Sequence, residues 1–192
     1  MSLNILLVSD QMIKDRTAIH GNIDPELIKP DIKVAQDMYI HPILGTALYD
    51  KLQTDISGTG TTTGNYKILL DRYIVDTLMW YVLSELPTTI SYQFWNKGVV
   101  RKQGESTDLP SMEELVDLQN KYKNRAEFYA NRLRLYLKQN ASTMFSEYLN
   151  AGSGVDTIHP ENKSFSMPVY LGDGFDCDKT FEEKYQGNNP SC

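Results

Sequence analysis

Three histidines are the first residues to test for chemistry, because imidazole serves both as a metal ligand and as a general base. They are His20, His41 and His159. None has a second histidine or a cysteine at the spacing of a zinc site. The G-x-S-x-G, H-E-x-x-H, P-loop and G-x-G-x-x-G motifs are also missing from the sequence. We therefore predict no catalytic residue, no bound metal and no cofactor, and expect that the protein is not an enzyme.

Three carboxylates near the end of the chain, Asp173, Asp176 and Asp178, form one candidate cation site. Such a cluster could bind a hard cation such as calcium. Its order does not match an EF-hand loop, which has a glycine after the third acidic position and a glutamate further on. We interpret the run as a solvated acidic turn. A metal-dependent enzyme that uses these carboxylates is the alternative.

Basic and aromatic residues alternate in the segment 90–103, which is β-branched and aromatic around Asn96 and Gly98. This pattern predicts a β-hairpin-like loop. Its charges and rings could contact nucleic acid by stacking, or pack against a neighbouring subunit. We favour the subunit, because three positive charges are few in an acidic chain. The basic residues are Lys97, Arg101 and Lys102, and the candidate interface residues are Phe94, Trp95, Val99 and Val100.

An apolar strip lies in the last part of the chain, after the Gly-Ser-rich residues 151–154. Its apolar side chains alternate as in a strand, but Pro168 excludes a central place in a sheet. Two interpretations remain open: the strip adds to another subunit, or it folds back on its own helices. The candidate interface residues are Phe165, Met167, Val169, Tyr170 and Leu171.

The composition is that of a globular protein with an acidic balance. Hydrophobic residues make up 41% and charged residues 23%, with a formal net charge of −6. An acidic chain is poorly suited to coating DNA, whose affinity for proteins depends on neutralised phosphates. No apolar stretch reaches the length of a membrane span, and we expect no secretory signal. Cys177 and Cys192 are too few for a disulfide framework, so we expect free thiols in a reducing cytoplasm.

Helical periodicity dominates the first 150 residues. We expect a short helix over Asp10–Arg16, then a helix that has Pro30 in its first turn, ends at His41-Pro42 and restarts at Ile43. A flexible surface loop is expected over residues 57–64.

Two longer helices complete the predicted body. One runs from Gly64 to Leu86 and stops at Pro87, and the other begins at Ser111 with a capping box. A further short helix is expected over Ala141–Leu149. The prediction is a mainly α fold: an antiparallel bundle of about four main helices in a domain at 1–150, with the loop 90–103 and an extended C-terminal tail at 151–192 that acts as an interaction arm.

The helix–break–helix pattern carries a resemblance. Asn22-Ile23-Asp24, Ile32, Ala35-Gln36 and Ile40-His41-Pro42-Ile43-Leu44-Gly45-Thr46-Ala47-Leu48-Tyr49 resemble the amino-terminal helices of phage head-to-tail connector (adaptor, or neck ring) proteins, especially those of Bacteroides and crAss-like phages. The resemblance covers roughly residues 4 to 140. The tail from residue 151 onward is outside it.

This resemblance implies a structural virion protein. Such a subunit forms a homo-oligomeric ring of about twelve copies below the portal protein. The ring contacts a neighbouring neck or tail ring protein and continues the DNA channel. The resemblance thus implies assembly in the host cytoplasm and a final place at the virion neck, with no membrane. DNA would pass through an acidic lumen without specific binding. The alternative is a phage-encoded cytoplasmic helical factor that handles or packages DNA. The basic loop from Lys97 to Lys102 is the observation that suggests it.

Overall fold

The computed structural model describes residues 5–59, 61–96, 98–101 and 110–161 of the chain. They belong to a compact unit that extends from Met1 to Glu161, past the predicted boundary at residue 150, while residues 162–192 form a second unit. The prediction of a mainly helical fold is confirmed.

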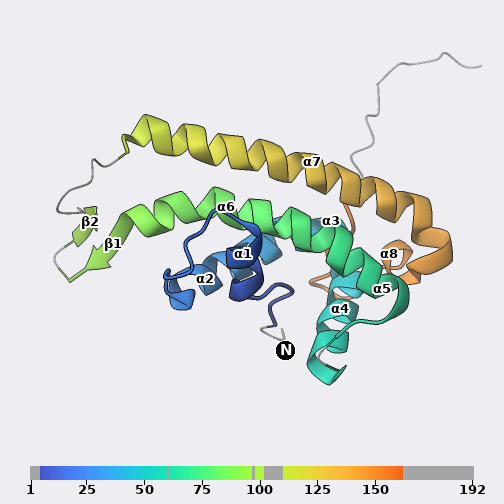
Figure 1. Ribbon diagram of the computed structural model, residues 1–192. Helices are drawn as coiled ribbons and strands as arrows, with labels where there is room; N and C mark the ends of the chain where they lie inside the picture. Colours follow the sequence, from blue (N-terminus) through green and yellow to red (C-terminus); the bar gives the residue numbers. More distant parts are fainter. Residues whose placement is uncertain (1–4, 60, 97, 102–109, 162–192) are drawn as a thin grey trace, which may run out of the picture. The chain divides into compact units, whose positions relative to one another are not determined.

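Two long antiparallel helices, α6 (Val75–Ser91) and α7 (Met112–Met144), pack against each other along the first unit (Figure 1). The other side of α6 is covered by α2 (Pro25–Ala35) and by the π-helical turn η1 (Gln36–Ile40). The remaining helical elements are α1 (Asp10–Arg16), α3 (His41–Leu44), α4 (Thr46–Thr59), α5 (Gly64–Leu69), the π-helical turn η2 (Leu70–Ile74) and α8 (Ser146–Leu149).

Local capping explains where several helices begin. The Ser9 hydroxyl accepts a hydrogen bond from the Met12 amide at the start of α1. At the start of α7, Ser111 and Glu114 form the predicted capping box, each side chain accepting from the other residue's amide. These bonds satisfy amides that lack a partner within the helix.

The prediction that a helix ends at His41-Pro42 and restarts at Ile43 is wrong. The backbone of His41 stays right-handed helical, and the His41 amide donates to the Gln36 carbonyl, five residues back. Proline lacks an amide hydrogen and its ring crowds the carbonyl four residues back, so the wider π-turn accommodates it within a continuous path. The actual break lies at Gly45, where φ is +76°.

Two other prolines also lie inside helices, contrary to prediction. Pro25 occupies the first turn of α2, and Pro30 lies further along it. Pro87 does not stop α6, which continues to Ser91. An interior proline costs about 3 kcal/mol. This cost is offset by packing, because α6 buries nine side chains and each apolar one contributes roughly 1.5–3 kcal/mol.

Other predicted boundaries shift as well. Residues 57–59 belong to α4 and Thr62 is buried, so the predicted surface loop at 57–64 is shorter than expected. α7 continues to Met144, so the short helix after it begins at Ser146 instead of Ala141.

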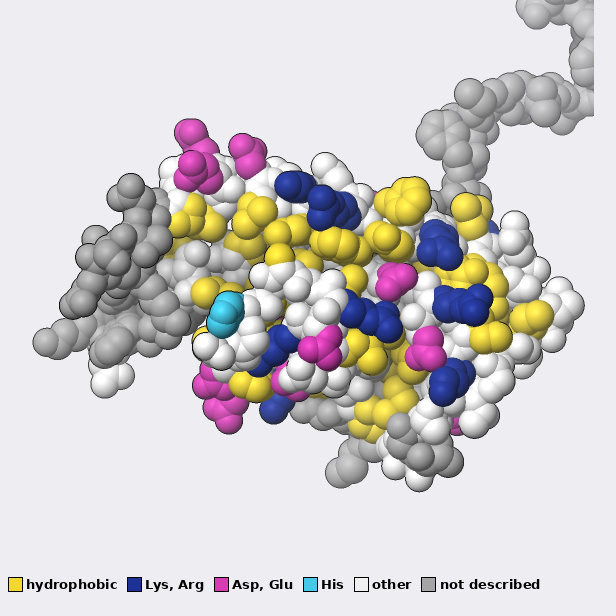
Figure 2. Space-filling view, in the orientation of Figure 1, with side chains coloured by type: hydrophobic (Ala, Val, Ile, Leu, Met, Phe, Trp, Pro, Cys, Tyr) yellow, Lys and Arg dark blue, Asp and Glu magenta, His cyan; other side chains and the backbone are white. Residues whose placement is uncertain are grey.

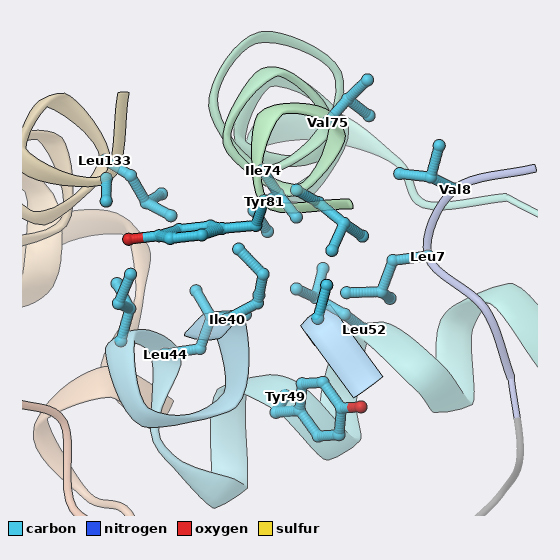
Figure 3. Packing of buried hydrophobic residues seen from close by; sticks show 14 of the residues in the cluster. Leu7, Val8, Ile40, Leu44, Tyr49, Leu52, Ile74, Val75, Tyr81 and Leu133 are labelled. Carbon is cyan, nitrogen blue, oxygen red and sulfur yellow. The ribbon is translucent and has the colours of Figure 1, made fainter. Parts of the chain in front are cut away.

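The core lies where α6, α7 and the α2–η1–α3 path meet. The ring of Tyr81 lies between Leu133 of α7 and Ile40 and Leu44 of the lower helices (Figure 3). Tyr39 stacks on the same ring, with the two centroids 4.0 Å apart. A core of tightly packed apolar and aromatic side chains holds the elements in fixed relative positions.

The segment after α6 contains two short strands, β1 (Tyr92–Trp95) and β2 (Gly98–Arg101). They pair antiparallel, with Tyr92 opposite Arg101 and Trp95 opposite Gly98. Across the described part of the chain, no helix is both long and apolar enough to cross a membrane.

Candidate interaction surfaces

The break between α3 and α4 has a conformation that requires glycine. Gly45 has φ +76° and ψ 159°, a region almost closed to residues with a side chain. A Cβ atom at this position would lie 2.7 Å from Cδ and 2.8 Å from Cγ of Pro160. Gly45 is therefore needed both for the turn and for the close approach of a segment more than a hundred residues later.

That later segment is held by the backbone at both of its ends. The Thr46 amide donates to the Ile158 carbonyl over 3.0 Å, and the Ile158 amide donates to Thr46 Oγ1 over 2.8 Å. Three residues on, the Glu161 amide donates to the Pro42 carbonyl over 2.9 Å. Residues 158–161 are thus fixed against the turn at residues 42–46.

An ion pair between a nearly buried arginine and an exposed glutamate adds a third attachment, to α7. Arg134 Nη2 lies 3.1 Å from Glu161 Oε2, and the Arg134 side chain is only 10% exposed. Its Nη1 also donates to Asn131 Oδ1. Loss of the Glu161 carboxylate would leave the nearly buried Arg134 charge without this partner, so the pair favours a position of Glu161 beside α7. We call this set of contacts the arm anchor; it consists of Pro42, Gly45, Thr46, Arg134, Ile158, Pro160 and Glu161.

His41, whose ring contacts anchor residue Thr46, has a structural environment. Its ring stacks on Tyr49 with centroids 4.4 Å apart, and its Nε2 lies 3.1 Å from Thr46 Oγ1. Burial lowers the pKa of His41. A neutral ring can accept the Thr46 hydroxyl hydrogen while that oxygen accepts from Ile158, which suits a supporting role rather than catalysis.

Gln36 supports the turn from the other side. This side chain is fully buried, and its Oε1 accepts from the Leu7 amide while its Nε2 donates to the Ile5 carbonyl and to the Tyr49 hydroxyl. The Tyr49 hydroxyl in turn donates to Asp37. Residues 5–8 are thereby attached to η1 and α4, which stiffens the base of the anchor.

Aromatic rings and arginines alternate where η2 and α6 meet α7. Tyr73 and Tyr136 stack with centroids 4.0 Å apart, and the Arg132 guanidinium lies 5.0 Å from the Tyr73 centroid. Arg125 lies 4.9 Å from the centroid of Trp80. Such cation–π contacts contribute about 0.5–1 kcal/mol each at exposed sites. Figure 2 shows basic and hydrophobic side chains side by side along this line.

The outward side of α7 carries large apolar side chains that are mostly exposed, although the Phe128 ring contacts the Tyr129 ring edge to face at 5.4 Å between centroids. Phe128 is 66% exposed and Leu135 is 61% exposed. They are seven residues apart, so they lie on the same side of the helix. Exposed aromatic and aliphatic groups next to arginine are typical of protein interfaces.

The residues predicted as interface residues fall into two groups. Phe94 and Trp95 lie in β1, Val99 and Val100 lie in β2, and the register places Phe94 opposite Val99; the surroundings of their side chains are not described. The tail residues Phe165, Met167, Val169, Tyr170 and Leu171 lie outside the described residues, as do Asp173, Asp176 and Asp178.

Sequence reasoning missed the residues that form the anchor and the exposed α7 face. Two patterns pointed toward them: a His-Pro pair occurs at both 41–42 and 159–160, and both pairs meet at the anchor. Gln36 stands out as an amide in an apolar helical stripe. Phe128 and Leu135 are ordinary apolar residues within a helix, and the sequence does not identify them as exposed until the core is known.

Among residues 5–161 as described, no group of three or more His, Cys, Asp or Glu side chains could hold a metal ion. Residues 40–158 match a protein family described as a family of unknown function, DUF6712. No curated protein matches the chain, and no solved structure matches it. The matched region begins beside one half of the anchor and ends at Ile158 in the other half.

Proposed function

The chain belongs to DUF6712, a family without an assigned function, and we propose that it is a structural virion protein: a head-to-tail connector subunit that forms a ring below the portal. In this proposal α2, α4, α6 and α7 are the four main helices of an antiparallel bundle. The strands β1 and β2 form a β-hairpin-like loop that projects to a neighbouring subunit.

The arm anchor is the observation that carries the proposal. The segment that resembles connector proteins, around Ile40 to Tyr49, contains the turn that receives residues 158–161. Everything after Glu161 therefore starts from a fixed point on the helical unit. A ring subunit that links several partners needs such an extension with a defined origin, because loose attachment lowers the effective concentration of a linked segment.

The charge balance and the exposed apolar side chains support the same function. A net charge of −6 suits a lumen through which DNA slides without binding. Phe128 and Leu135 supply exposed apolar surface for neighbouring copies, the portal and the next neck or tail ring protein. The sequence offers Phe94, Trp95, Val99 and Val100 as further candidate contacts. Ring closure requires two different surfaces per copy that fit each other.

A mixing experiment tests the proposal. The full chain is combined with the portal protein of its own phage and examined by native mass spectrometry and electron microscopy. The expected result is a closed ring of defined copy number on one end of the portal. Phe94→Ser with Trp95→Ser should weaken the ring, while Val34→Ser with Met38→Ser serves as the matched control. A chain that stays monomeric in the presence of the portal would refute the proposal.

One observation favours a second function, the cytoplasmic DNA-handling or packaging factor. From Leu118 to Met144, α7 carries six Lys or Arg against one Glu, a net +5 in an acidic chain. Arginines next to aromatic rings also contact single-stranded nucleic acid. Salt-dependent DNA binding at physiological ionic strength would favour this function, and no binding at low salt would exclude it.

A further inference from the structure

The outward face of α7 combines apolar and basic side chains in one continuous strip. Phe128 and Leu135 are separated by seven residues, or about 10 Å along the helix. Their helical neighbours on that side are basic or uncharged: Arg125 and Arg132 flank Phe128, and Arg132 and Lys138 flank Leu135. We call this strip the α7 face; it consists of Arg125, Phe128, Arg132, Leu135 and Lys138, all exposed in the first unit.

The charge of the α7 face restricts what can cover it. A second copy of the same face would bring like charges together as apolar groups are buried, and like charges across an interface oppose association. The occupant must therefore supply apolar side chains together with carboxylates. On α7 itself, acidic side chains lie in the first turn, and basic side chains lie further along the helix (Figure 2).

This chain contains one segment with that chemistry outside the described residues. Residues 165–178 read FSMPVYLGDGFDCD. They contain six large apolar residues, three aspartates and no lysine or arginine. The segment matches the α7 face in both respects, apolar groups for Phe128 and Leu135 and carboxylates for the basic residues around them.

We propose that the α7 face of one copy binds the segment 165–178 of a neighbouring copy, so that each subunit receives one arm and donates one. The proposal rests on the ring function proposed above. A receptor surface and a donor segment that differ from each other give a heterologous contact, which is the kind that closes a ring.

The length of the chain beyond the anchor is sufficient for this reach. The arm begins at residue 162, directly after Glu161, whose position is fixed by Arg134. Residues 162–178, when extended, span about 55 Å at roughly 3.3 Å per residue. The α7 face, from Arg125 to Lys138, is about 20 Å long at 1.5 Å per residue. Roughly 35 Å of the extended arm therefore remains to reach an adjacent subunit.

A cysteine cross-link between two different variants tests the contact, because the arm already carries Cys177. The donor is the full chain with Cys192→Ser. The acceptor is the full chain with Asn124→Cys, Cys177→Ser and Cys192→Ser, which places a thiol four residues before Phe128. Only a contact between copies joins the two. The matched control acceptor carries Lys29→Cys, exposed on α2, with the same serine replacements.

We expect a covalent dimer with the Asn124→Cys acceptor in at least tenfold higher yield than with the Lys29→Cys acceptor, falling as salt rises. Phe128→Ala with Leu135→Ala in the acceptor, or Asp173, Asp176 and Asp178 all changed to Asn in the donor, should each reduce the yield at least tenfold. Circular dichroism of each variant checks that the helices remain.

Equal yields with both acceptors, or no α7 dimer at millimolar chain concentration, would overturn the proposal. A donor–acceptor dimer that is insensitive to the aspartate replacements would overturn the charge argument. The portal experiment tests the connector function independently. If a ring forms on the portal but no cross-link forms, only the proposed arm contact is refuted. A cross-link without a ring would leave the arm contact standing and refute the connector function.

Discussion

Replacement of Gly45 with alanine separates the two reasons for glycine at the anchor. The first is backbone conformation, because φ +76° with ψ 159° is strained for any residue with a Cβ and costs on the order of 1–3 kcal/mol. The second is contact, because the new Cβ would lie 2.7 Å from Cδ and 2.8 Å from Cγ of Pro160. Overpacking of this kind costs typically about 1–3 kcal/mol more. We therefore expect Gly45→Ala to lower the free energy of unfolding by about 2–6 kcal/mol.

Pro160→Ala provides the matched second variant, because alanine keeps Cβ but lacks the two atoms that would clash. Alone it should cost about 1 kcal/mol or less, mainly through greater freedom of the unfolded chain. In Gly45→Ala/Pro160→Ala most of the contact cost disappears, because only the backbone nitrogen of residue 160 stays close, at 3.2 Å, and the conformational cost remains. The double variant should thus recover about 1–3 kcal/mol relative to the sum of the single variants.

Urea denaturation followed by far-ultraviolet circular dichroism measures the three free energies. Hydrogen exchange at the Thr46 and Ile158 amides adds a local readout, since both amides are hydrogen-bonded in the anchor. They should exchange faster in Gly45→Ala and slow again in the double variant. Free energies that add within about 0.5 kcal/mol would show that the two positions are not coupled, and would refute the close contact between the turn and residue 160.

Three other predictions concern the buried polar groups. Gln36→Leu leaves the Leu7 amide and the Ile5 carbonyl without their partner, so it should lower the free energy of unfolding by about 2–4 kcal/mol in urea denaturation. The exposed Gln139→Leu should change that free energy by less than about 0.5 kcal/mol. Equal effects of the two variants would contradict a buried hydrogen-bonding role for Gln36. Burial lowers the pKa of His41, so the unfolded chain binds a proton on this ring more readily, and stability should fall as pH drops below about 6.5. In melting curves at several pH values, His41→Gln should make the melting temperature depend less on pH. An unchanged pH dependence would exclude His41 as its source. Burial raises the pKa of Tyr39, Tyr66 and Tyr81 to about 12. Near-ultraviolet titration at about pH 11 should therefore show fewer ionised tyrosines in the folded chain than in the chain unfolded by urea. Equal numbers would contradict the burial of these three hydroxyl groups.

Caps and periodicity were enough to predict individual helices. Ser9 and Ser111 cap α1 and α7 as their side-chain chemistry requires. Proline was the weaker guide, since Pro30, Pro42 and Pro87 all lie inside helical paths. The local cost of a proline is about 3 kcal/mol, and a core that buries several flanking side chains exceeds it. Local sequence rules fail where the free energy of tertiary packing exceeds the local cost of the residue.

The arm anchor could not be predicted from spacing, because its halves are far apart in the chain. Gly45 meets Pro160, and Arg134 meets Glu161, only after α6 and α7 have packed. From sequence alone, Gly45 predicts only a turn between two helices, and Arg134 predicts only a solvated charge on the surface of α7. The role of Gly45 depends on its close approach to Pro160, and that of Arg134 depends on its burial, and neither can be predicted from the residue type. The same applies to Phe128, whose exposure has meaning only once the inward side of α7 is known.

The two π-turns changed the faces that a simple helical period assigns. Each π-turn adds one residue to a turn, so every side chain after it is rotated by about 100° relative to a continuous α-helix. In the helix predicted from Gly64 to Leu86, η2 at Leu70–Ile74 rotates the side chains of α6 relative to those of α5. With that rotation Tyr73 stacks on Tyr136 beside Arg132, while Tyr81 enters the core further along. A helical period counted straight through a π-turn therefore assigns the wrong face to the residues after it, and here η2 and α6 both contact α7 while α6 also packs against α2 and η1.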